Sequence, residues 1–217
     1  PADLIREAER AHKIGITYEK PQVDWQTISR RVWEQIDVSK GIEESFGQME
    51  NITLFVGEGF FTGPHDMTVR LNTGGEAALS GKRFLIATGA RTKLPPVEGL
   101  ETVDYITSES FFGPKYPEKP YESLVIAGGG TIAVEFAHIF AAMGTKDEEI
   151  SELSLWQLKE FGVDVRTGFE VVRAEAVLEG QLVTARGRAT GDELSVTAQA
   201  FLVASGVRPE TDKLNLQ

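Results

Sequence analysis

The chain has 217 residues, of which 41% are hydrophobic and 25% charged, the composition of an ordinary globular protein of one or two domains. Its net charge of -11 argues against nucleic-acid or anionic-membrane partners, because phosphate binding needs clustered Lys and Arg. Cysteine is absent, which excludes disulfides and thiolate metal sites within these residues.

The first part of the chain is expected to open with two helices. Residues 3–11 carry apolar side chains at helical spacing, and this helix should end near Gly15. Asp24 is typical of a helix N-cap. Inward-facing residues follow it at helical spacing: Trp25, Ile28, Val32 and Ile36.

Short strands are expected after these helices. The β-type runs are Ile52–Val56, Asp66–Leu71 and Arg83–Ala87, and a turn is expected at residues 72–75. A long connection rich in proline and glycine follows the third run. We place a domain boundary in this region, near Asp104.

The second part of the chain contains a glycine-rich turn between a predicted strand and a predicted helix. Ser123–Ala127 is an apolar run typical of a parallel strand buried on both faces, and Gly128-Gly129-Gly130 follows it directly. Apolar residues then recur at helical spacing up to Gly144, which has the position of a helix C-cap. This context predicts dinucleotide binding, and the alternative is a tight turn that binds nothing.

Particular residues of this turn have physical reasons to be there. Gly128 permits the tight turn off the strand, and Gly130, which has no Cβ, lets a pyrophosphate approach the backbone. Ala133 is small enough for helix and strand to touch. The helix directs free N–H groups and its positive dipole end at the phosphates. Glu135 is interpreted either as a solvated carboxylate or as a carboxylate near the nicotinamide.

The region after Gly144 departs from the expected order. A parallel strand should follow the crossover helix, but residues 147–149 look like the acidic first turn of another helix. We therefore expect on the order of ten or more residues to be missing between Lys146 and Asp147, since a strand needs about five or six. The alternative is a direct helix–helix turn at Gly144. Val163–Arg166 is then the next strand, and Val171–Leu202 an antiparallel meander.

Four segments, in this order, resemble motifs of the flavoprotein disulfide reductases, which include dihydrolipoamide dehydrogenase, mercuric, glutathione and mycothione reductases. The segments are Val56–Phe61, Phe84–Arg91, Val125–Ala137 and Val203–Pro209. The resemblance implies an α/β fold, with a Rossmann-like nicotinamide domain carrying an antiparallel meander and the rear part of an FAD-binding Rossmann-like domain. On this basis residues 1–104 are expected to form a partial FAD-binding domain, and residues 105–217 the NAD(P)-binding domain.

Several motifs of that family have no counterpart in this sequence. They are the first FAD-binding glycine turn, the C-x4-C redox pair, the second flavin motif and the C-terminal interface domain with its His-Glu pair. The chain is therefore expected to be most of an oxidoreductase rather than the whole of one. We assign no catalytic residue and no metal ligand within it.

The resemblance implies FAD and either NAD or NADP as cofactors, with a hydride passing from nicotinamide through flavin to a disulfide. The predicted FAD contacts are Gly59, Ala87, Thr88 and Gly89. The predicted NAD(P) contacts are Gly128, Gly129, Gly130, Thr131, Ile132, Ala133, Glu135 and Gly206. The residue that usually distinguishes NAD from NADP would fall on Glu148, about 20 positions past the first glycine. Because Glu148 is expected to begin a helix, we leave this choice open.

The expected partners are a small-molecule or protein-bound disulfide substrate and a second copy in a two-fold homodimer. A cytoplasmic location is expected, which the absence of cysteine fits. No apolar stretch approaches the ~20 residues of a membrane span, and no signal-peptide pattern opens the chain. Two other functions stay open. One is a thiol-free dinucleotide-binding module without reductase activity, which the absence of cysteine favours; the other is a thiol-independent flavin oxidase.

Overall fold

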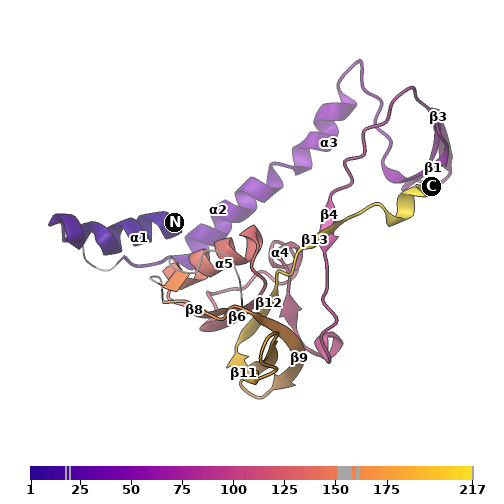
Figure 1. The fold of residues 1–217 in the computed structure, drawn as a ribbon. Coiled ribbons are helices and arrows are strands. Elements are labelled where there is room, and N and C mark those ends of the chain that lie inside the picture. The colour runs from indigo at the N-terminus through magenta and orange to yellow at the C-terminus, as the bar shows by residue number, and fades with distance from the viewer. Residues whose placement is uncertain (18, 20, 151–157, 160–161, 217) are drawn as a thin grey trace. The chain divides into compact units, whose positions relative to one another are not determined.

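The computed structural model describes all residues except 18, 20, 151–157, 160–161 and 217 (Figure 1). Its contacts divide the chain into two compact units. The larger unit comprises residues 1–28 and 92–207, and the smaller unit comprises residues 29–91 and 208–217. The changes from one unit to the other fall after Ile28, Arg91 and Val207. The expected division into an FAD-binding part and an NAD(P)-binding part near Asp104 stays a prediction.

The two helices predicted near the start of the chain are confirmed. α1 (Ala2–Arg10) continues into a 3-10 turn (Ala11–Ile14) that ends at Gly15 with a left-handed φ of 81°. α2 (Trp25–Asp37) begins after Asp24, whose carboxylate accepts a hydrogen bond from the backbone N–H of Thr27 at 3.0 Å. Asp24 therefore acts as the expected N-cap.

A five-stranded parallel sheet forms the centre of the larger unit (Figure 1). Its order is β5 (Tyr105–Ile106), β12 (Ala200–Val203), β6 (Ser123–Ala127), β7 (Lys146–Ile150) and β8 (Asp164–Val165). α5 (Thr131–Ala142) connects β6 to β7, the crossover that a parallel pair requires. The predicted Rossmann-like α/β fold is confirmed.

Alternate residues of β6 enter two different hydrophobic clusters, as the period of two along a strand demands. Leu124 and Ile126 pack with α5, whereas Val125 and Ala127 pack with the antiparallel strands described below. All four are at most 5% exposed. β6 is therefore buried on both faces, as its unbroken apolar sequence predicted.

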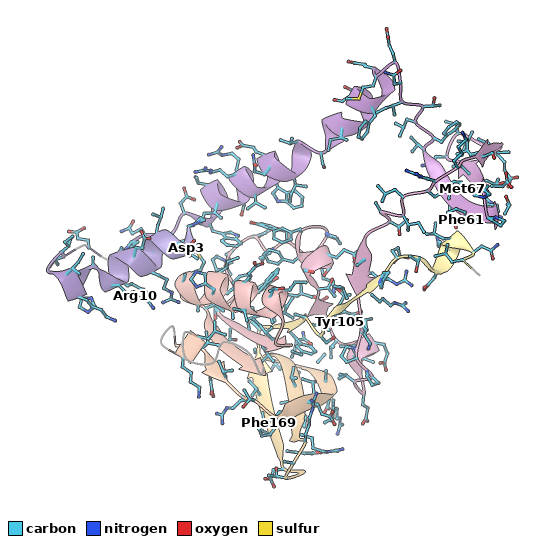
Figure 2. All side chains as sticks on the ribbon, turned by 45° about the horizontal axis from the view of Figure 1, so that its top comes forward. Asp3, Arg10, Phe61, Met67, Tyr105 and Phe169 are labelled. Atoms are coloured by element: carbon cyan, nitrogen blue, oxygen red, sulfur yellow. The ribbon has the colours of Figure 1, made fainter. Side chains whose placement is uncertain are left out.

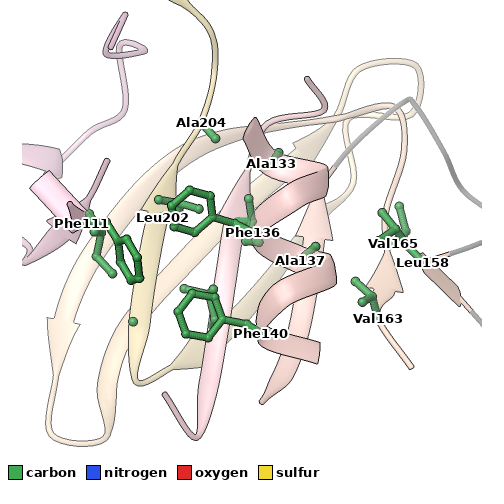
Figure 3. Close-up of a cluster of buried hydrophobic side chains, with 14 of the residues drawn as sticks. Phe111, Ala133, Phe136, Ala137, Phe140, Leu158, Val163, Val165, Leu202 and Ala204 are labelled. Atoms are coloured by element: carbon green, nitrogen blue, oxygen red, sulfur yellow. The ribbon is translucent and has the colours of Figure 1, made fainter. Parts of the chain in front are cut away.

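The α5 side of this core is rich in aromatic rings (Figure 3). α4 (Ser108–Phe111) contributes Phe111, whose ring lies 5.0 Å from that of Phe136 and 5.7 Å from that of Phe140. Trp25 joins the same cluster, and its indole N–H donates to the carbonyl of Pro117 at 2.9 Å. Ala133 is fully buried, which agrees with the small residue predicted at that position.

An antiparallel meander packs against the other side of the parallel sheet. Its strands are β9 (Phe169–Val177), β10 (Gly180–Gly187) and β11 (Glu193–Ala198). The prediction that the meander extends to Leu202 is wrong, because residues 200–203 form β12 of the parallel sheet. Their unbroken run of buried apolar residues suits a strand covered on both faces.

The prediction of a helix that begins at Asp147 is also wrong for residues 147–150, which lie in a strand. Strand β7 runs through Lys146 and Asp147 and pairs with β6, so that Lys146 lies opposite Ser123 and Ile150 opposite Ala127. This strand returns the chain to the sheet. The missing residues inferred between Lys146 and Asp147 stay a prediction. Most of the predicted helix, residues 151–157 and 160–161, lies outside the described residues.

The smaller unit contains an antiparallel sheet of β1 (Gly57–Gly63), β2 (Asp66–Leu71) and β3 (Glu76–Ser80). Figure 2 labels Phe61 and Met67, which lie opposite each other in β1 and β2. The predicted strand over residues 66–71 and the turn after it are confirmed. α3 (Lys40–Gly47) precedes this sheet, and β4 (Ala90–Thr92) pairs with β13 (Val207–Pro209).

The strands predicted at Ile52–Val56 and Arg83–Ala87 are wrong. Both segments are irregular, and Leu85 is 93% exposed. A strand exists only where a neighbour completes its backbone hydrogen bonds, and no described strand pairs with either segment. Their apolar composition alone therefore misled the prediction.

Candidate functional site

The glycine-rich turn lies where β6 ends and α5 begins. Gly128 has a φ of 151°, and a Cβ added to it would lie 2.2 Å from the carbonyl oxygen of Ala204. The same stretch of chain is held by a hydrogen bond from the Ala204 N–H to the Ala127 carbonyl at 2.8 Å. Gly128 is thus required by the close approach of the chain that follows β12.

Gly130 is a glycine for a different reason. It is the N-cap of α5, its backbone is extended, and a Cβ added to it would meet no protein atom within 4 Å. The first N–H groups of α5 have no partners in the helix, and the positive end of the helix dipole lies here. The open space beside Gly130 therefore suits an anionic group.

This space belongs to a pocket of about 630 Å³ in the larger unit. The pocket lies at the carboxyl ends of β6 and β12, the neighbouring strands from which the sheet extends in opposite directions. Ligands of open α/β sheets bind at such switch points. Its lining residues are Pro95, Pro96, Ala127, Gly128, Gly129, Gly130, Gly168, Phe169, Glu170, Val171, Val172, Arg188, Ala204, Ser205 and Gly206.

The structure brings only some of the predicted nicotinamide residues together in this pocket. Residues 128–130 and Gly206 line it. Thr131 and Glu135 are exposed on α5, Ile132 packs against the core, and Ala133 is buried within the core. Contact between these α5 side chains and a nucleotide stays a prediction.

The predicted flavin residues lie in the smaller unit, and none of them is among the residues that line the pocket beside Gly130. Gly59 lies within β1, and residues 87–89 lie in the irregular stretch before β4. The carbonyl of Gly89 accepts the backbone N–H of Glu210 at 3.0 Å, so that its acceptor is already used once. Contact between these residues and a flavin stays a prediction.

Sequence reasoning missed the pocket wall that the meander supplies. Glu170 lies in β9, and Arg188 directly follows β10. The Nε atom of the Arg188 guanidinium lies 3.7 Å from Oε2 of the Glu170 carboxylate. The Arg188 backbone N–H donates to the Gly168 carbonyl at 2.8 Å. The register of β9 with β10 places these residues side by side, and no motif in the sequence announces such a pairing.

Two further observations bear on the kind of site. In the part of the chain that the structure describes, no group of three His, Cys, Asp or Glu side chains is arranged to hold a metal ion. Among the same residues, no helix is both long and apolar enough to cross a bilayer.

The fold and the pocket define a Rossmann-like α/β protein with a glycine turn at the switch point of its sheet. The sequence profile of one family, described as pyridine nucleotide-disulphide oxidoreductase, matches residues 5–217. The chain belongs to this family, and the resemblance drawn from its motifs is confirmed.

Curated relatives carry several different names. The chain is 31% identical to dihydrolipoamide dehydrogenase of Chaetomium thermophilum, with 83% of this chain and 38% of that protein covered. It is 33% identical to glutathione reductase of Burkholderia cepacia, with 89% and 43% covered. It is 34% identical to mercuric reductase of Lysinibacillus sphaericus, with 76% and 31% covered.

A solved structure shares the fold. The HOCl-induced flavoprotein disulfide reductase RclA from Escherichia coli matches with a TM-score of 0.69 and 25% identity over 86% of this chain and 44% of that one. The chain thus spans less than half the length of the proteins it matches.

Proposed function

We propose that the larger unit binds NADH or NADPH in the pocket beside residues 128–130, and that the protein is an FAD-dependent disulfide oxidoreductase. The observation that carries nucleotide binding is the open space at Gly130, which lies at the N-terminus of α5 and within a pocket of about 630 Å³. Family membership supports the redox function.

The chain's own residues fit a dinucleotide at this position. The bare backbone of Gly130 and the free N–H groups of α5 would hold the pyrophosphate, because a Cβ would fill the space that it needs. Val171 and Val172 supply apolar surface to the same pocket, as an aromatic base or ring requires. The protein's part in catalysis is then to bind the nucleotide and fix its orientation.

The chemistry that the two cofactors would supply when bound is transfer of a hydride from nicotinamide through flavin to a disulfide. The chain has no cysteine, so none of its residues supplies that disulfide. A disulfide substrate, FAD contacts at Gly59 and at residues 87–89, a homodimer and a cytoplasmic location belong to this proposal.

Nucleotide titration of the full chain tests the proposal. Gly130→Val should abolish binding of NADH and NADPH while leaving the fold intact, because its side chain would enter the space meant for the pyrophosphate. Gly41→Val is the matched control, since its Cβ also meets no atom within 4 Å but lies in α3. Unchanged nucleotide affinity in Gly130→Val would contradict the proposal.

The absence of cysteine favours a second candidate, a dinucleotide-binding module without reductase activity. Absorbance and turnover separate the two functions. A reductase would show flavin absorbance and would consume NADH or NADPH when a disulfide is added, whereas the module would bind nucleotide without either signal.

A further inference from the structure

We propose that residues 93–99 form a strap that holds two walls of the nucleotide pocket at a fixed separation, with Ser205 and Gly99 as positioning residues at its two ends. The strap and both walls belong to the larger unit. The role of the strap rests on the proposed function, because the pocket beside Gly130 is taken to hold a nicotinamide dinucleotide.

One end of the strap is attached to the chain that follows β12. The Lys93 N–H donates to the Gly206 carbonyl at 2.9 Å, and the Ser205 hydroxyl donates to the Lys93 carbonyl at 2.7 Å. Ser205 and Gly206 themselves line the pocket. Both backbone groups of Lys93 are therefore bound to the wall that the parallel sheet supplies.

The other end of the strap is attached to β9. The Glu98 N–H donates to the Val172 carbonyl at 3.0 Å, and the Glu98 carbonyl accepts the Ala174 N–H at 2.8 Å. Val172 lines the pocket, on the wall that the meander supplies. Gly99 permits this close approach, because its φ is 77° and a Cβ added to it would lie 2.3 Å from the Ala174 carbonyl oxygen.

The strap is stiff between these two ends. Pro95 and Pro96 line the pocket, and the proline ring fixes φ at each of them. The Val97 N–H donates to the Pro95 carbonyl at 2.9 Å, and the Val97 side chain is buried in the hydrophobic cluster of the meander. A short segment with so little conformational freedom keeps its two attached ends at a constant spacing.

A constant spacing of the walls should favour nucleotide binding. Ordering a loose segment opposes association, so a pocket that is already formed binds more tightly. Releasing either end of the strap should weaken NADH and NADPH alike, because the strap acts on the shape of the pocket. The glycine turn should keep its conformation, since the bond from the Ala204 N–H to the Ala127 carbonyl holds it separately.

Titration of the full chain with NADH and NADPH tests the attachment to β9. Gly99→Ala should weaken both nucleotides by about fivefold to tenfold, because its methyl group pushes the strap away from Ala174. The matched control is Gly144→Ala. Gly144 also has a left-handed φ, 88°, but a Cβ added to it would meet no atom within 4 Å, and it follows α5 outside the pocket lining. This variant should lose stability through its φ and keep its nucleotide affinity.

Ser205→Ala tests the other end, because it removes the hydroxyl and adds no bulk. It should weaken both nucleotides by about fivefold. Combined with Gly99→Ala, it should weaken binding by less than the product of the two single effects, since a strap detached at one end no longer fixes the spacing. Effects that multiply in the double variant would show that Ser205 contacts the nucleotide directly, and would overturn its positioning role.

Hydrogen exchange of the unaltered protein provides a measurement that needs no variant. NADH should slow exchange at the N–H groups of Glu98 and Ala174, because a ligand that binds better to the attached strap also favours the attached state. The Phe111 N–H in α4, which donates to the Thr107 carbonyl at 2.9 Å, is the control and should keep its rate.

The outcomes separate the strap from the proposed function. Unchanged nucleotide affinity in a folded Gly99→Ala, or unchanged exchange at Glu98 and Ala174, would overturn the role of the strap and leave nucleotide binding standing. Failure of the native chain to bind either nucleotide would overturn the proposed function and the strap with it. Circular dichroism shows whether each variant is folded. If Gly99→Ala is not, Ser205→Ala and hydrogen exchange decide.

Discussion

Gly128 and Gly130 lie two residues apart, yet the protein needs them for different reasons. A Cβ at Gly128 would lie 2.2 Å from a backbone oxygen, whereas a Cβ at Gly130 would meet only open space. The first glycine is therefore a requirement of folding, and the second is a requirement of the proposed ligand.

This difference predicts that alanine substitutions at the two positions affect stability unequally. Gly128→Ala should lower the free energy of unfolding by about 1–3 kcal/mol or more, since it combines a left-handed φ with a clash against backbone. Gly130→Ala should leave stability almost unchanged. Urea unfolding monitored by circular dichroism measures both. Equal midpoints for the two variants would contradict the prediction and show that the chain after β12 moves easily at Ala204.

Tyr121 links stability to alkaline pH. Burial, with a smaller effect of the Asp104 carboxylate, raises the pKa of Tyr121 from its usual 10 to about 12. The folded state thus favours the neutral phenol, and this contribution is fully present below about pH 10 and is lost as pH rises toward about 12. In Tyr121→Phe the free energy of unfolding should fall less steeply across this range. Parallel curves for the two proteins would contradict the shift.

At the scale of elements, α5 is stabilised by the aromatic face that it turns to the core. The Phe140 ring is 1% exposed and lies 5.4 Å from that of Tyr121 and 6.2 Å from that of Trp25. Phe140→Ala should cost about 3–5 kcal/mol of unfolding free energy, because it leaves a cavity among rings that cannot collapse fully. Ile139→Ala, at a side chain 38% exposed on the same helix, should cost clearly less. Chemical denaturation distinguishes the two.

The elements that were predicted correctly from sequence are specified by residues within or next to each element. The β6–α5 unit has an unbroken apolar strand, a glycine turn and helical periodicity, and each of these is a local property. Asp24 likewise marks the start of α2 by a hydrogen bond made three residues away. Such elements can be predicted because their causes lie within one short stretch of chain.

The elements predicted wrongly depend on distant partners. The apolar runs at Ile52–Val56 and Arg83–Ala87 have strand composition but lack a described strand beside them. Residues 146–150 have the acidic composition of a helix start, yet they pair with β6 across the sheet. The pocket wall at Arg188 and Glu170 arises from the register of the meander, which composition does not encode.

At the scale of the whole molecule, the smaller unit is built from two stretches far apart in the chain. Residues 208–217 join it through Arg91, which pairs with Glu210 and Asp212, and through Asn215, whose side-chain amide donates to the Phe61 carbonyl at 3.0 Å. Lys213 adds an ion pair with Glu58 at 3.2 Å, so the attachment of the returning segment should depend in part on charge.

Arg91→Gln should therefore loosen the returning segment. Hydrogen exchange should become faster at the Glu210 N–H, which donates to Gly89, while amides of the β1–β2 ladder keep their rates. Arg70→Gln serves as the control, because its ion pair with Glu76 at 3.5 Å lies within the β2–β3 hairpin. Added salt should have the same effect as the Arg91 substitution, since exposed ion pairs are screened.

The division of the smaller unit also has a consequence for the newly made chain. Residues 29–91 leave the ribosome before residues 92–207, and residues 208–217, which belong to the same unit, leave only after them. At the usual speed of translation this delay is on the order of ten seconds, far longer than a small domain takes to fold. The larger unit can therefore fold before residues 208–217, which pack with residues 29–91 in the smaller unit, have been synthesised. During that interval the apolar side chains of Leu54, Phe55 and Leu85 are where a chaperone would bind.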